Sequence, residues 1–185
     1  MHPWLHFKTI TRHKLLVMHY CFRVGLYKQG LLHDLSKYSP TEFLVGARYF
    51  QGNRSPNNAE REDIGVSTSW LHHKGRNRHH FEHWVDYSLD KKHVIMGAPM
   101  PRRYVAEMVM DRISASRVYA GDTYTDQAPL AYWLKGKDKL WFVHPVTRRD
   151  LEGLLRILSD YGEETALRYI KNVYLKKEDY YKRKV

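Results

Sequence analysis

The chain has 185 residues, 43% hydrophobic and 28% charged, and this composition excludes a disordered protein. The length predicts a single domain over residues 1–185, with a core at about 8–118 and C-terminal helices at about 120–185 packed on it. Lysine and arginine number 31 against 20 acids, which gives a net charge of +11. Such a surface favours anionic partners, such as nucleotides or nucleic acid.

Cys21 is the single cysteine, so no disulfide can form within the chain. No stretch approaches the ~20 apolar residues of a membrane span. The first residues lack the apolar segment of a signal peptide. We therefore expect a cytoplasmic protein without a membrane partner.

An apolar period of 3.6 residues dominates the sequence and predicts an all-α fold. The predicted helices cover residues 8–27, 31–35, 39–50, 63–73, 79–87, 101–119, 132–134, 148–160 and 163–178. Between them we expect loops at 51–62, 90–100 and 121–129, and a basic break at 74–78.

Several residues predict where helices begin and end. Ser39, Pro40 and Glu42 follow the order of a capping box with proline at the first helical position. Asp63 and Thr147 are expected N-caps. Gly162 is expected to separate the last two helices.

The chain contains twelve histidines. Five of them are concentrated within twelve residues, at His72, His73, His79, His80 and His83. Histidine is the commonest metal ligand and a frequent acid or base in catalysis. This cluster therefore indicates a metal or catalytic site, with a basic surface loop as the alternative.

Two polar residues lie on helix faces that are otherwise apolar. His13 begins a stripe that continues through Val17, and Asp111 lies between Met108 and Ala115. A buried carboxylate without a partner is costly, so we expect Asp111 to face a cation or an arginine.

The segment Gly30–Lys37 is an apolar run that ends in His33 and Asp34 and is followed, three residues after the aspartate, by Lys37. This segment resembles the signature of the HD-domain superfamily of metal-dependent phosphohydrolases. In that superfamily a histidine on an earlier helix and an aspartate on a later helix complete the ligands, and His13 and Asp111 match them. The resemblance implies an HD-domain-like helical bundle with a metal site between helices. The whole sequence also resembles a small uncharacterised family of Gram-positive bacteria and phages.

Two imidazoles and two carboxylates suit one divalent transition-metal ion, such as Mn, Fe, Co, Ni or Zn. HD proteins that bind a second ion add histidines between the His-Asp pair and the last aspartate. Here His72 or His73, and His79 or His80, occupy that interval, and the sequence leaves open which of each pair is a ligand. His83 is expected to be a neighbour only.

Other polar residues are candidates for catalysis or for phosphate binding. Asp34 and Lys37 are predicted catalytic residues, with Lys37 in contact with phosphate. Glu107, four residues before Asp111, is predicted to act as a hydrogen-bond acceptor or general base; an exposed ion pair with Arg103 or Arg112 is the alternative. The predicted phosphate-binding residues beside the histidines, which a solvated basic loop would equally explain, are Lys74, Arg76 and Arg78.

These features predict a metal-dependent phosphohydrolase that acts on a nucleotide or another phosphate ester through a metal-activated water. One alternative is an HD-type di-iron oxygenase or oxidoreductase. Another is a non-catalytic, basic, helical protein that binds nucleic acid, because aromatic residues alternate with lysine and arginine over 174–184. The sequence leaves open the substrate, the metal and the oligomeric state.

Overall fold

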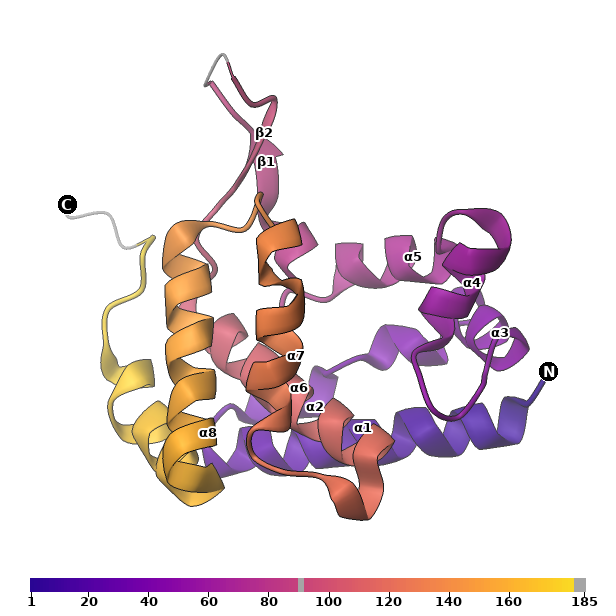
Figure 1. Ribbon diagram of the computed structural model, residues 1–185, viewed down its shortest axis with the longest axis horizontal. Helices are drawn as coiled ribbons and strands as arrows, with labels where there is room; N and C mark the ends of the chain where they lie inside the picture. Colours follow the sequence, from indigo (N-terminus) through magenta and orange to yellow (C-terminus); the bar gives the residue numbers. More distant parts are fainter. Residues whose placement is uncertain (90–91, 182–185) are drawn as a thin grey trace.

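In the computed structural model, which describes residues 1–89 and 92–181, the chain is all-α apart from one small hairpin (Figure 1). This confirms the predicted fold class. The helices are α1 (Pro3–Arg23), α2 (Tyr27–Leu32), α3 (Pro40–Arg48), α4 (Pro56–Ile64), α5 (Thr68–Arg76), α6 (Arg102–Ala120), α7 (Ala128–Gly136) and α8 (Pro145–Asn172). Short 3₁₀ turns cover Leu35–Tyr38, Phe81–Trp84, Gly121–Thr123, Lys137–Lys139 and Tyr174–Lys176.

Helix α6 forms the centre of the core, packing against α1 on one side and against α7 and α8 on the other. Its residues Val105, Val109 and Ile113 recur every four positions and are fully buried. This spacing places them on one helical face, which explains why the helix forms against the core. Val17 of α1 and Leu155 of α8 belong to the same cluster.

Glu163 of α8 connects this helix to α1 and α6. Its Oε2 accepts hydrogen bonds from the Tyr20 hydroxyl at 2.8 Å and from Arg117 Nη2 at 2.7 Å. Gly162, immediately before it, has φ 80° and ψ 169° and interrupts α8. The predicted break at Gly162 is therefore confirmed, but the helix after it ends at Asn172 instead of residue 178.

A β-hairpin projects from the helical body (Figure 1). Strand β1 (Val85–Tyr87) pairs antiparallel with β2 (Ile95–Gly97). The prediction of a helix over 79–87 is wrong, because a 3₁₀ turn leads directly into β1. The predicted loop at 90–100 contains β2, and its residues 90–91 lie outside the described part of the chain.

Other boundaries also differ from prediction: α2 covers Tyr27–Leu32 instead of 31–35, and α7 covers Ala128–Gly136 instead of 132–134. Helix α1 begins at Pro3 instead of residue 8, because His6 and Ile10 continue its buried face, and it ends at Arg23 instead of residue 27. Most of the predicted loop at 51–62 is helix α4. Helix α5 continues through the predicted basic break to Arg76.

Two of the predicted N-caps are wrong. Ser67, not Asp63, caps α5 by accepting a hydrogen bond from the Trp70 amide. His144 caps α8 by accepting from the Val146 amide. Thr147 instead accepts a hydrogen bond from the Met100 amide at 2.9 Å, which ties α8 to the segment before α6.

The predicted capping box at the start of α3 is correct only in position. The helix does begin at Pro40, but Ser39 makes no side-chain cap hydrogen bond.

Among the described helices, none combines the length and the apolar character that crossing a bilayer requires.

Gly97, at the end of β2, lies against the backbone of the segment before α8. A Cβ atom there would overlap the carbonyl oxygen of Phe142 and the amide of His144. We expect Gly97→Ala to lower the free energy of unfolding by about 1–3 kcal/mol. The matched control is Gly153→Ala in α8, where a Cβ meets nothing within 4 Å and the change should raise stability by about 0.5–1 kcal/mol. Chemical denaturation measures both, and an equal effect of the two changes would contradict the close packing of the hairpin.

Candidate metal centre

Several segments bring histidines and acids to one buried place between the helices. Helix α1 contributes His13, the end of α2 leads into His33 and Asp34, and α5 contributes His73. The residues after α5 and the central helix α6 supply the rest. The members of this cluster are His13, His33, Asp34, His73, His79, His80, Glu107 and Asp111.

Asp34 lies at the centre of the cluster and is 2% exposed. Its Oδ2 lies 3.8 Å from His13 Nε2 and 3.3 Å from His33 Nε2. Its other oxygen, Oδ1, lies 3.3 Å from His73 Nε2 and 3.5 Å from His79 Nε2. The two oxygens of one carboxylate thus face two different pairs of histidines.

The backbone of Asp34 is also unusual. With φ 53° it is the only non-glycine residue of positive φ in the described part of the chain. Aspartate tolerates this left-handed conformation better than most residues, yet it remains sparsely populated. Such local strain is typical of functional positions.

The donor atoms form three groups, each with its atoms within 4.8 Å of one another. Two of the groups share Asp34, and the third consists of His33, His79 and Glu107. Site 1 is defined here as His13, His33, Asp34 and Asp111. Site 2 is defined as Asp34, His73, His79 and His80. Each site is large enough to hold one metal ion, so the predicted set of ligands can hold one or two.

Some buried atoms of the cluster lack the partners that a folded protein normally provides. His13 Nε2 lies 2.9 Å from Asp111 Oδ1, and Asp34 Oδ2 lies 2.6 Å from Lys37 Nζ. In contrast, His33 Nε2, His79 Nε2 and Asp34 Oδ1 are buried and make no hydrogen bond. Unpaired buried polar atoms are rare and costly, and these three atoms are of the kind that divalent transition metals bind. The donor set therefore fits a metal ion.

Glu107 orients one histidine of each site. Its Oε1 accepts a hydrogen bond from His33 Nδ1 at 2.9 Å and lies 3.1 Å from His79 Nδ1. Each ring then keeps Nε2 free to face Asp34, an arrangement typical of metal-binding histidines. The predicted acceptor role agrees with these contacts, and the alternative of an exposed ion pair is wrong because Glu107 is buried.

Glu42 of α3 does the same for His73, and sequence reasoning missed it. Its Oε2 accepts from His73 Nδ1 at 2.8 Å, and its Oε1 accepts from His72 Nδ1 at 2.6 Å. The assignment of Glu42 to a capping box concealed this role. A signal was present, since Glu42 lies one turn before the buried Gly46 and therefore on the same face of the helix.

The contacts separate the histidine pairs that the sequence could not order. His73 lies in site 2, whereas His72 is outside both sites and contacts Glu42, so the prediction of His72 as a ligand is not supported by the geometry. Both His79 and His80 belong to site 2. His83 lies outside both sites, as expected, with its ring against Trp84.

The charged groups of the cluster shift the pKa values of one another. Burial alone would lower the pKa of His33, but Asp34 and Glu107 outweigh it and raise that pKa to about 10. Burial would likewise raise the pKa of Asp34, yet His33 and Lys37 hold it well below its usual range. Burial and the neighbouring His79 keep the pKa of His80 well below its usual range, which favours the neutral, ligating form. The positive charges of His33 and Lys37 thus stabilise the ionised form of Asp34.

The predicted basic residues lie in different places. Lys37 Nζ is 2.6 Å from Asp34 Oδ2, and its side chain is 30% exposed, so it lies at the edge of the cluster. Arg76 donates to the backbone oxygen of His72, and Arg78 donates to the Tyr104 hydroxyl. Lys74 is partly buried on α5. Of these cations, Lys37 is the one in direct contact with a member of the cluster.

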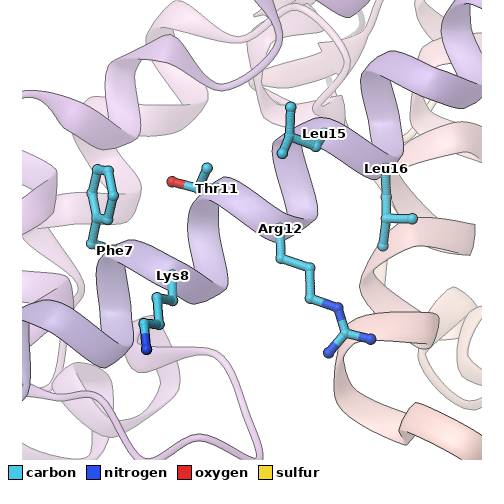
Figure 2. A pocket seen from close by; sticks show the side chains of 6 residues that line it. All are labelled: Phe7, Lys8, Thr11, Arg12, Leu15 and Leu16. Atoms are coloured by element: carbon cyan, nitrogen blue, oxygen red, sulfur yellow. The ribbon is translucent and has the colours of Figure 1, made fainter.

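A shallow hollow lies elsewhere, on the outer face of α1 (Figure 2). Its walls come from this one helix, with Lys8 and Arg12 on one side and Phe7 and Leu15 on the other. The cluster residue His13 is on the opposite, buried face of the helix. This hollow is therefore separate from the metal centre.

The fold and the cluster define a helical protein with a buried His/Asp centre able to hold metal ions. A family model matches residues 2–157, a span that contains every residue of the cluster. The chain therefore belongs to this family, which is described as a family of unknown function (DUF5662). No match was found among curated proteins or among solved structures.

The shared carboxylate predicts an unequal effect of ligand substitutions on metal content. We expect wild-type protein to bind about two divalent ions per chain, and His13→Ala or His73→Ala about one, since each removes a ligand of a single site. Asp34→Ala should lose both ions, because its two oxygens face both sites. Elemental analysis after loading with Mn²⁺ or Fe²⁺ measures this, with His83→Ala as the control that keeps both. Loss of a single ion in Asp34→Ala would contradict the shared ligand.

Proposed function

We propose that the protein is a metal-dependent phosphohydrolase of the HD type, acting on a nucleotide or another phosphate ester. The observation that carries this proposal is the Asp34 carboxylate, whose two oxygens face two groups of histidines. The order of ligands along the chain, from His13 through His33 and Asp34 to Asp111, supports it, because the HD signature has the same order.

Site 1 would hold one ion through two imidazoles and two carboxylates, and site 2 another through three imidazoles and the shared carboxylate. Such mixed nitrogen and oxygen donors suit Mn, Fe, Co, Ni or Zn better than Mg or Ca. When bound, these ions lower the pKa of water towards neutrality and neutralise charge on a phosphoryl group.

The protein's own residues supply orientation and charge. Glu107 and Glu42 accept hydrogen bonds from the ligand rings and fix the direction of each Nε2 atom. Lys37 provides a partly exposed ammonium at the edge of the cluster, and we assign it to a phosphoryl oxygen of the substrate. The net charge of +11 raises the local concentration of anionic substrates.

The same donors would also hold two irons, which keeps the di-iron oxidoreductase as the competing proposal. Three imidazoles in site 2 permit it, because imidazole suits iron as well as zinc or nickel. Two bound irons together with oxygen consumption, and no release of phosphate, would support that alternative. Salt-dependent binding to nucleic acid without any turnover would support the non-catalytic one.

Removal of the Lys37 ammonium should affect turnover more than metal binding. We expect Lys37→Ala to lower kcat/KM for a phosphate ester by about 100-fold, as loss of one charge-stabilising group does. Phosphate release from p-nitrophenyl phosphate and a nucleotide panel measures it, on protein stripped with a chelator and reloaded with Mn²⁺. Lys28→Ala, an exposed lysine of α2, is the matched control and should be unchanged. Phosphate release that survives metal removal would overturn the proposal.

A further inference from the structure

Arg112 directly follows the site 1 residue Asp111 on α6 and lies in an aromatic cage. Its guanidinium carbon is 5.8 Å from the ring centroid of Phe81, 5.9 Å from that of Tyr132 and 5.6 Å from that of Trp133. The negative face of an aromatic ring attracts a guanidinium, and more strongly when the cation is desolvated. The cage therefore holds the cation in place.

Among the described residues, no carboxylate lies at ion-pair distance from this cation. Burial lowers the pKa of Arg112, and the more distant Asp111 and Glu82 offset only part of this effect. The Nε atom of Arg112 is buried without a hydrogen-bond partner. Arg117, one and a half turns later on the same helix, has a similarly unpartnered Nε and stacks on Tyr124, but its Nη2 is paired with Glu163. A half-buried cation without an ion-pair partner is one that an incoming anion can neutralise.

The cage is also placed beside the metal centre. Arg112 follows Asp111 of site 1, and Phe81 follows His80 of site 2. Tyr132 is 72% exposed, so the cage is open to solvent on the side of this ring.

We propose that Arg112, with Phe81, Tyr132 and Trp133, forms an anion-binding subsite that takes a second anionic group of the substrate, next to the group held at the metal centre. The inference rests on the proposed function and narrows its substrate class to esters with at least two phosphate or carboxylate groups. The planar guanidinium presents parallel N–H donors to two oxygens of such a group. The aromatic rings orient those donors, so little order is lost on binding.

Pyrophosphate, which has two phosphate groups, is the probe, and orthophosphate, which has one, is the comparison. We expect Arg112→Gln to weaken pyrophosphate binding about 10- to 100-fold in isothermal titration calorimetry, as loss of a charged hydrogen bond does. The affinity for orthophosphate should fall much less in the same variant. Arg103→Gln, an exposed arginine on the same helix, should bind both ions as wild type does. Equal losses for both ions, or wild-type affinity in Arg112→Gln, would overturn the subsite.

A second measurement does not depend on the variant folding. Phenylglyoxal labels accessible arginines, and peptide mass spectrometry locates the label on wild-type protein. We expect pyrophosphate to protect Arg112 and to leave Arg103 unprotected. Labelling of Arg112 that pyrophosphate does not change would overturn the subsite.

Arg112→Lys, which keeps the charge and loses the planar donors, should bind pyrophosphate with intermediate affinity.

Metal content and phosphate release, measured on the same samples, separate this inference from the proposed function. Bound metal and turnover with no dependence of pyrophosphate binding on Arg112 would leave the phosphohydrolase standing and remove the subsite. Pyrophosphate binding that depends on Arg112, in protein that releases no phosphate from any ester, would keep the anion subsite and remove the phosphohydrolase.

Discussion

A single buried carboxylate organises the centre of this protein. Asp34 is withdrawn from water, and each of its oxygens faces two imidazole nitrogens from different parts of the chain. An isolated carboxylate in such a place would be very costly, so its surroundings have to be cationic. Lys37 meets part of this demand from one side. The unpaired Nε2 atoms of His33 and His79 show that the hydrogen bonds of the protein meet only part of the rest. A metal ion is one ligand able to satisfy these atoms together.

Two glutamates fix the orientation of the histidine rings around Asp34. Glu107 comes from the central helix α6 and Glu42 from α3, so they hold histidine rings from different elements of the fold. Helix α6 is fixed by its buried Val109 and Ile113. The orientation of the rings is therefore set by the packing of the core, and a centre held in this way needs little rearrangement to bind an ion. Arg112 lies on the same helix, with its guanidinium over the ring of Trp133, so core packing also fixes the position of this cation.

The features that sequence reasoning could predict are local or strongly periodic. Helix α6 was predictable because its apolar residues repeat every four positions, and His33 and Asp34 because adjacent ligands follow an apolar run. Glu42 was not, because a capping pattern explains it locally, whereas its partners His72 and His73 are some thirty positions away. Helix α4 was hidden for a similar reason: its polar Glu60 is buried by hydrogen bonds from the segment that follows. The inward direction of His73 rather than His72 depends on how α5 docks, which no spacing encodes.

The central claim is that Asp34 lies between two metal positions. The most direct test is a crystal structure of protein loaded with Mn²⁺ or Fe²⁺, with anomalous diffraction recorded on both sides of the metal absorption edge. The account predicts two anomalous peaks, one beside Oδ2 of Asp34 among the site 1 residues and one beside Oδ1 among the site 2 residues. No peak within coordination distance of Asp34, in crystals that contain the metal elsewhere, would contradict it.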